Sequence, residues 1–305
     1  MSIAVAHLVR KANGLEPFRR FVESYRNVDA GVAHDLVLLL KGFDRGGDAA
    51  AHLALAPSAQ AIQLPDTGLD LGSYSTAARQ LEQRRLCFLN SFTTLLSDGW
   101  LAKLNAALDD PSVGIAGATG SWGSHWSWLL YELGLPTVYA RVFPSRREAR
   151  RALIRIAESR EVTVRARSGA VAAVGALVRL PFFAGRFDAF PSPHLRTNAF
   201  LVGSDVMRSW RIGRIRGKWD AFALESGRRS LTRHVESRGL RAVVVGADGS
   251  PFGAEEWPDS DTFWQREQSN LLVADNQTEQ YTNGDADLRT FLSRFAWAER
   301  AEPGA

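Results

Sequence analysis

The chain has only one cysteine, Cys87, among its 305 residues. A disulfide framework and a zinc site built on cysteines are therefore excluded. The sequence also lacks a run of about 18 consecutive apolar residues, which a membrane-spanning helix would need. Its first residues, MSIAVAHLVRK, lack the order of basic, apolar and small residues that marks a secretory signal. These absences predict a cytoplasmic protein.

Two common nucleotide-binding motifs are missing as well. No Gly-x-Gly-x-x-Gly follows the first apolar run, and there is no Walker-type Gly-Lys-Ser/Thr loop. Apolar residues make up 45% of the chain and charged residues 23%, which is ordinary for a globular protein. The length is enough for one large α/β domain with a substantial core.

Positive charge is concentrated in two stretches, although the net charge is only +4. The first stretch spans 145–167, and the second spans 208–218. Within the first, arginines recur at helical spacing beside an apolar stripe, which predicts a basic helix over 145–158 with a solvated face. Peripheral membrane association through this helix is the second interpretation. Nucleic acid is not expected as a partner, because no nucleic-acid motif or interleaved aromatic residues accompany the charge.

The first 120 residues alternate between short apolar runs and amphipathic segments. Expected strands lie at 3–9, 36–40, 61–64, 86–89 and 113–118, with helical patterns between them. Such alternation is typical of βαβ crossovers. It predicts an α/β fold whose doubly wound, mainly parallel sheet has helices on both faces.

The rest of the chain is less regular. We expect a helical insertion at about 121–180, and a loop over 181–193 that is rich in aromatic residues and proline. A strand is expected at 197–203, a helix within 219–238 and a strand at 242–246. On this basis residues 1–254 form a single catalytic domain, and 255–305 form a C-terminal extension that packs on it.

Two segments place polar groups where α/β proteins bind ligands. The run LCFLNS ends a buried strand in Asn90 and Ser91, and Asp98-Gly99-Trp100 then opens a helix. Later, Glu225 precedes a basic segment that ends at Arg238-Gly239 and leads into a strand. This order resembles GT-A fold glycosyltransferases of the large inverting, rhamnosyltransferase-like family. The chain departs from that family where Leu-Asn-Ser replaces Asp-x-Asp and where Ser226 replaces the second residue of Glu-Asp.

The resemblance implies a glycosyltransferase that moves a sugar from a nucleotide-sugar donor to a saccharide or glycoconjugate acceptor, in polysaccharide biosynthesis. Inverting transfer needs a carboxylate to take the proton of the acceptor hydroxyl, and Glu225 is the candidate base. The structural alternative is a glutamate at a helix N-terminus, stabilised by the helix dipole. A retaining outcome also stays open.

The donor site is expected to combine three groups of residues. The turn Asp66-Thr67-Gly68-Leu69-Asp70 resembles one that lies near the nucleotide in the family, although Asp70 could instead cap a helix. Neutral hydrogen bonds are expected from the strand tip at Asn90 and Ser91. Arginine forks match phosphate oxygens, so Arg229 and Arg233 are candidates for the diphosphate if the helix that follows Glu225 is continuous. Ion pairing of these arginines with Glu225 or Glu236 is the alternative.

The sugar and acceptor site is expected at the mouth of the 197–203 strand. Strand alternation places His194, Arg196 and Asn198 on one face, and Trp264 would supply an aromatic platform for a sugar ring. Alternatively, His194 is a structural histidine and the Trp264 segment only packs on the sheet.

No metal site is predicted, because the strand tip has no carboxylate and hard cations favour carboxylate oxygen. We therefore expect no required cofactor and weak or no metal dependence, and a Mg²⁺ or Mn²⁺ requirement is the alternative. Two other functions stay open. One is a catalytically inactive sugar- or nucleotide-binding protein of the same fold, and the other is a basic surface-interaction module of an unrelated α/β fold.

Overall fold

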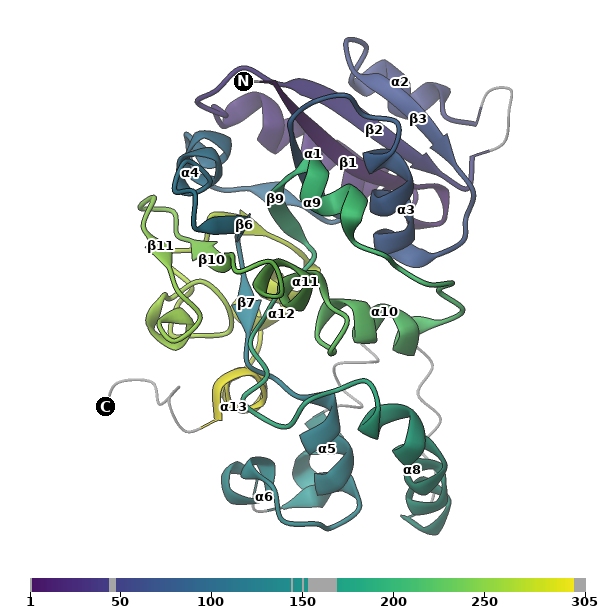
Figure 1. The fold of residues 1–305 in the computed structure, drawn as a ribbon, viewed down its shortest axis with the longest axis vertical. Helices are drawn as coiled ribbons and strands as arrows, with labels where there is room; N and C mark the ends of the chain where they lie inside the picture. Colours follow the sequence, from purple (N-terminus) through teal and green to yellow (C-terminus); the bar gives the residue numbers. More distant parts are fainter. Residues whose placement is uncertain (1, 44–47, 144, 150, 153–168, 299–305) are drawn as a thin grey trace.

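A computed structural model describes residues 2–43, 48–143, 145–149, 151–152 and 169–298 of the protein. Its centre is an eight-stranded sheet with the order β11-β10-β6-β9-β4-β1-β2-β3 (Figure 1). The strands are β1 (Ile3–Arg10), β2 (Asp35–Lys41), β3 (Gln60–Leu64), β4 (Arg85–Leu89), β6 (Val113–Gly117), β9 (Ala199–Gly203), β10 (Arg241–Val245) and β11 (Pro251–Phe252). These strands include all the expected ones, with boundaries shifted by up to two residues.

Most strand pairs in this sheet are parallel. β1 pairs in parallel with β2 and β4, β2 with β3, and β6 with β10. β9 runs antiparallel between β4 and β6, and β11 runs antiparallel to β10 at the edge. The prediction of a mainly parallel α/β sheet is confirmed.

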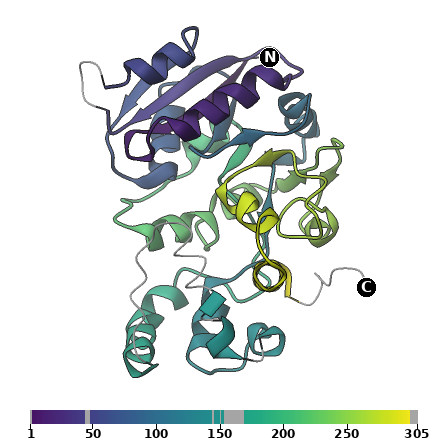
Figure 2. The ribbon, with the colours of Figure 1, turned by 180° about the vertical axis from the view of Figure 1, so that it is seen from behind.

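Helices cover both faces of the sheet, as predicted (Figure 2). Side chains of β1 alternate between two cores: Ala4, Ala6 and Leu8 face one, while Val5 and Val9 face the other. The first core receives α3 (Leu69–Ala78), α9 (Ser204–Ser209) and α11 (Leu231–Glu236). The second receives α1 (Glu16–Asn27), α2 (Ala50–Leu55) and α4 (Trp100–Ala107).

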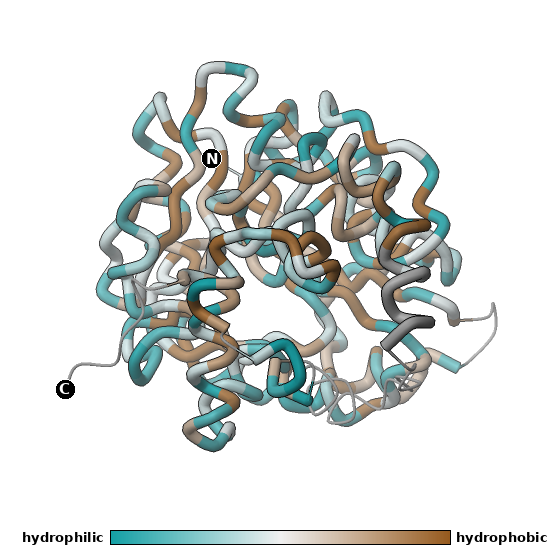
Figure 3. Tube along the Cα trace, turned by 90° about the horizontal axis from the view of Figure 1, so that it is seen from below, coloured by the Kyte–Doolittle hydropathy of each residue, from teal (hydrophilic) through white to brown (hydrophobic). Residues whose placement is uncertain are grey.

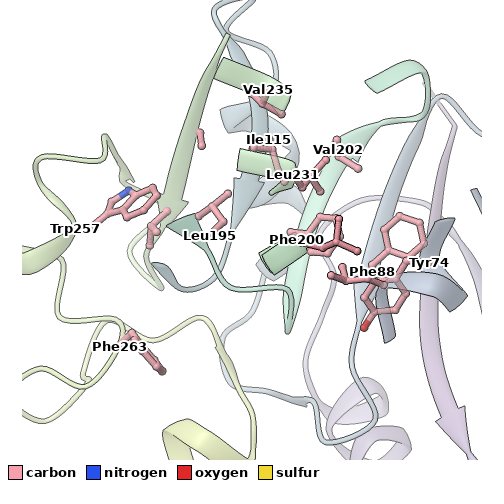
Figure 4. Packing of buried hydrophobic residues seen from close by; sticks show 14 of the residues in the cluster. Tyr74, Phe88, Ile115, Leu195, Phe200, Val202, Leu231, Val235, Trp257 and Phe263 are labelled. Carbon is pink, nitrogen blue, oxygen red and sulfur yellow. The ribbon is translucent and has the colours of Figure 1, made fainter. Parts of the chain in front are cut away.

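Aromatic residues fill the first core next to the strand tips. Figure 4 shows Tyr74 of α3 beside Phe88 of β4 and Phe200 of β9. The ring centroids of Tyr74 and Phe88 are 4.8 Å apart, and those of Phe88 and Phe200 are 5.4 Å apart. In the trace coloured by hydropathy, hydrophilic stretches lie in many of the outer loops (Figure 3). Because these strands are apolar and buried along their length, polar groups lie beyond the strand ends.

Three helices gather at the end of the molecule opposite α2 and β3 (Figures 1 and 2). They are α5 (His125–Glu132), α6 (Val138–Val142) and α8 (Gly169–Ala184). The expectation of a loop from residue 181 onward was wrong for its first four residues, because α8 continues through Pro181 to Ala184. Phe183 and Phe187 pack with Leu129 there, so tertiary contacts sustain the helix end. Half of the residues of the basic helix expected at 145–158 lie outside the described residues, and of the described ones 146–149 and 151–152 are helical.

The remaining elements join the C-terminal segment to the sheet domain. The short strand β12 (Val273–Ala274) pairs with β5 (Thr94–Leu95), and β7 (Gly120–Ser121) pairs with β8 (His194–Leu195). Trp257 and Trp297 are buried in the same core cluster as Tyr74. The other helices are α10 (Lys218–Glu225), α12 (Asn276–Thr282), α13 (Ala286–Trp297) and the short 3₁₀ helices η1 (Lys11–Asn13) and η2 (Trp257–Asp259).

Candidate functional site

The strand order creates a switch point at the carboxyl ends of β1 and β4. From β1 the chain adds β2 and β3 on one side, and then returns to place β4 on the other side of β1. In open α/β sheets, ligands bind in the crevice outside the strand ends at such a point. The polar residues nearest to it are Arg10 at the end of β1, Lys41 at the end of β2 and Asn90 directly after β4.

An ion pair and a buried lysine lie at this edge. Arg10 Nε and Nη2 donate to the two carboxylate oxygens of Asp66 at 2.9 and 3.0 Å. This pairing raises the pKa of Arg10 and lowers the pKa of Asp66. Lys41 Nζ donates to the Leu69 carbonyl at 2.5 Å and to Ser73 Oγ at 3.2 Å, and burial lowers the pKa of Lys41. Both predicted aspartates therefore have cations close by.

Asp70 is coupled to the charges around it. Burial raises the pKa of Asp70, the charge of Lys41 opposes that rise, and the charge of Glu225 adds to it. Asp70 lies in the first turn of α3, whereas the N-cap is Gly68, whose φ of 73° is left-handed. The alternative that Asp70 caps this helix was therefore wrong. In the crevice at these strand ends, Asp66 and Asp70 therefore interact electrostatically with Arg10 and Lys41. The charge of Glu225 reaches Asp70.

The Glu225 carboxylate is held from the strand side of the crevice. Its Oε1 accepts the backbone N–H of Thr197 at 2.8 Å and the Thr197 hydroxyl at 3.0 Å. Glu225 is the last residue of α10, so the alternative of a glutamate at a helix N-terminus was wrong. The helix dipole does not favour an anion at this end. The hydrogen bonds from Thr197 stabilise the carboxylate instead.

The chain turns after Glu225 rather than continuing as one helix. A Cβ on Gly227 would lie 2.5 Å from the carbonyl oxygens of Ala223 and Arg186, so this close turn requires glycine. Ser230 then caps α11 by accepting the N–H of Arg233 at 3.2 Å. The condition that one continuous helix joins Glu225 to the arginines was therefore wrong.

The two predicted phosphate arginines have different surroundings. Arg233 forms ion pairs with Glu236 at 3.0 Å and with Asp188 at 3.4 Å. The pair with Glu236 is the one that the ion-pair alternative expected. Arg229 is exposed, and its Nη2 donates to the Arg211 carbonyl at 3.3 Å. Only Arg229 keeps its charge available for a ligand.

The tip of β4 is organised by its own hydrogen bonds. Asn90 Oδ1 accepts the N–H of Phe92 at 3.0 Å and the hydroxyl of Thr93 at 3.2 Å. The N–H of Asn90 donates to the Asn198 carbonyl at 2.8 Å, and Ser91 is buried. The Asn90 oxygen thus shapes the turn, and binding of the donor by Asn90 and Ser91 stays a prediction.

His194, Arg196 and Asn198 are all buried, but they do not share one continuous strand, since His194 belongs to β8 and β9 begins at Ala199. His194 Nδ1 contacts the Ser192 carbonyl at 2.8 Å, and burial lowers the pKa of His194. Asn198 Oδ1 accepts the Thr119 hydroxyl at 2.7 Å. The negative field of Glu225 reaches His194, which links this group to the crevice.

Arg196 forms a buried ion pair with a residue of the C-terminal segment. Its Nη2 lies 2.7 Å from Asp275 Oδ2, and its guanidinium lies 4.2 Å from the Phe263 ring centroid. Trp264 stacks on the same Phe263 at 4.3 Å, and its Nε1 donates to the Gln277 carbonyl at 3.0 Å. Because Trp264 is only 6% exposed, the protein already covers its ring. Sugar binding by Arg196 and Trp264 remains a prediction.

No group of three or more histidine, cysteine, aspartate or glutamate side chains within the described ranges is arranged to hold a metal ion. The residues that sequence reasoning missed are Arg10, Lys41 and Thr197. Arg10 and Lys41 carry the same signal that identified Asn90, namely a polar residue at the end of a buried strand. Thr197 has no such signal, because its partner is 28 positions away.

Similarity to known proteins is found among solved structures. No known protein family and no curated protein matches the sequence. Among solved structures, a mannosyltransferase from Pyrobaculum calidifontis in complex with GDP-Man and Mn²⁺ is similar, with 15% identity and a TM-score of 0.31. The match covers 38% of this chain and 34% of the mannosyltransferase chain. The S. aureus protein TarS, residues 1–349, has 14% identity and a TM-score of 0.30, over 38% and 35%.

A second TarS structure, in complex with UDP-GlcNAc, has 15% identity and a TM-score of 0.30, over 38% of this chain and 34% of that one. The chain thus spans about a third of the length of these structures. No helix in the described part of the chain combines the length and apolar character needed to cross a membrane.

Proposed function

We propose that the chain is a GT-A-like glycosyltransferase that moves a sugar from a nucleotide-sugar donor to a saccharide or glycoconjugate acceptor. The observation that carries the proposal is the carboxylate of Glu225, which Thr197 holds by two hydrogen bonds beside the switch-point crevice. Ligands of α/β sheets bind at this location. The sequence resemblance supports the same function independently, through the order of its motifs.

In the proposed reaction, the acceptor hydroxyl oxygen attacks the anomeric carbon of the donor sugar. A new carbon–oxygen bond forms, the bond from the anomeric carbon to the diphosphate breaks, and the nucleoside diphosphate leaves. Glu225 takes the hydroxyl proton. Thr197 donates only to Oε1, and among the described residues the other carboxylate oxygen is left to accept that proton. Attack opposite to the leaving group would invert the configuration.

The test compares the wild-type protein with Glu225→Gln in hydrolysis and transfer of a panel of sugar nucleotides. Removal of a general base is expected to lower kcat by about 10²–10⁴-fold. Glu82→Gln is the matched control, since Glu82 is exposed and precedes β4, at the end of that strand opposite to Asn90. Equal rates in Glu225→Gln and the wild type would exclude Glu225 as the base.

The second candidate is an inactive protein of the same fold that only binds a sugar nucleotide. The tip of β4 favours it, because Leu89 and Ser91 stand where family members carry the two carboxylates of Asp-x-Asp. The oxygen of Asn90 between them is used within its own turn. A ligand that binds the folded state raises the melting temperature by mass action. Stabilisation by nucleoside diphosphates without turnover of any donor would support this second candidate over the first.

A further inference from the structure

A cavity of about 390 Å³ beside α10 carries an excess of positive charge. Four arginines line it, and Asp220 is the only acidic residue among the described residues of its wall. Arg186 follows α8, and Arg214 and Arg216 follow α9. Arg229 lies in the turn after Glu225. Four guanidinium groups against one carboxylate give the wall a formal charge of +3.

The described part of the chain does not neutralise this charge with carboxylates. None of the four arginines has a guanidinium nitrogen within 4.0 Å of a described carboxylate oxygen, whereas nearby arginines do. Arg228 pairs with Asp188 at 2.8 Å, and Arg179 pairs with Glu132 at 3.6 Å. Asp220 accepts the backbone N–H of Arg216 at 2.9 Å, so its carboxylate is hydrogen-bonded to the loop backbone.

The wall also leaves room for a ligand to approach. Gly185 and Gly213 belong to the lining, and a Cβ on Gly213 would have no protein atom within 4 Å. The arginine side chains are exposed, so their guanidinium groups can reach a bound group. Arg186 lies with its guanidinium 3.9 Å from the ring centroid of Phe182, which orients its side chain. Such planar forks match the oxygens of a phosphate bidentately.

We propose that this cavity binds the phosphate group of a ligand. Ala223 and Leu224 of α10 line it, and Glu225 follows directly in the chain. A phosphate in the cavity therefore lies next to the helix end that carries the crevice carboxylate. Two sources supply the same chemistry: the diphosphate of a nucleotide, or a phosphate carried by a second ligand. The inference stands on the cavity and its charge, and it does not depend on sugar transfer.

The test is calorimetric titration with inorganic pyrophosphate, at low and high salt. Arg214→Gln combined with Arg216→Gln is expected to weaken binding about tenfold or more, because hydrogen bonds between charged groups are lost. Arg84→Gln combined with Arg147→Gln is the charge-matched control, since both residues are exposed and neither lines the cavity. Affinity should fall with added salt in the wild type.

Gly213→Leu provides a second variant that keeps every arginine. The Cβ at this position would have no protein atom within 4 Å, and the added side chain should also weaken pyrophosphate binding. Absence of pyrophosphate binding, or equal affinity in the double variant and its control, would overturn the proposal. Competition between UDP and pyrophosphate would identify the nucleotide as the source, and simultaneous binding would identify a second ligand. Pyrophosphate binding without any sugar transfer would refute the proposed function but leave this site intact.

Discussion

The ion pair between Arg196 and Asp275 gives the sharpest prediction for stability. The side chains are 6% and 1% exposed, and their charged atoms lie 2.7 Å apart. Asp275 also accepts the N–H groups of Gln277 and Thr278 at 3.0 Å as the cap of α12. Replacing Arg196 by methionine would leave a buried carboxylate without its cation. Breaking a buried pair in this way costs about 3–5 kcal/mol.

The pH dependence of this variant distinguishes a lost charge from lost packing. Burial alone would raise the pKa of Asp275, but Arg196 and the backbone hydrogen bonds lower it overall. The wild type therefore gains stability from Asp275 above the unfolded pKa of about 3.9, and it loses this stability as the pH falls through the folded pKa. Without Arg196 the folded pKa rises, so Arg196→Met should recover part of its loss as the pH is lowered toward about 5.

Urea denaturation from pH 5 to pH 8 measures both effects. Asp275→Asn combined with Arg196→Met completes a double-mutant cycle, in which the coupling energy should exceed about 1 kcal/mol. Arg241→Met is the control, since Arg241 forms an exposed pair with Asp110 and should change stability by less than about 1 kcal/mol. A loss below 1 kcal/mol for Arg196→Met, or a loss independent of pH, would refute the argument from the buried charge.

Three further predictions concern the crevice. Thr197→Val removes the hydroxyl that holds Glu225, so kcat for sugar transfer should fall about tenfold, and Thr197→Ser should restore it; an unchanged pH–rate profile in the valine variant would contradict a role through Glu225. Gly227→Ala should lower the free energy of unfolding by about 1–3 kcal/mol because its Cβ meets backbone oxygens at 2.5 Å, whereas Gly239→Ala, whose Cβ meets no atom within 4 Å, tests the separate cost of a left-handed φ. Chelation by EDTA should change the transfer rate by less than about twofold, since neutral groups at the β4 tip are poor ligands for hard cations; a rate restored only by Mn²⁺ would oppose this.

The sheet could be predicted because its central strands are buried on both faces. Runs such as the one at Leu36–Leu40 are apolar on both faces, and burial on both faces is what a strand under two layers of helices requires. The antiparallel insertion of β9 between β4 and β6 could not be predicted. Pairing of strands far apart in sequence depends on the whole core rather than on any local pattern.

The candidate site was predictable only in part, for a related reason. The identity of Glu225 followed from its sequence context, but its position at a helix end did not, because the clash that requires Gly227 involves the carbonyl of Arg186. Likewise, the pairing of Arg196 with Asp275 joins residues 79 positions apart. Long-range partners decide whether a polar residue is committed to the fold or available to a ligand.

Whether a charged residue is committed to the fold or available to a ligand determines how the protein could bind a negatively charged donor. The crevice at the strand ends contains the carboxylates of Asp66, Asp70 and Glu225 against the cations Arg10 and Lys41. Its own charge therefore does not favour a diphosphate. A cation bound at the β4 tip would correct this, yet the Asn90 oxygen already accepts two hydrogen bonds. The unneutralised arginines across α10 offer the compensating charge, so loss of Arg214 and Arg216 should weaken binding of a nucleoside diphosphate more than that of the nucleoside.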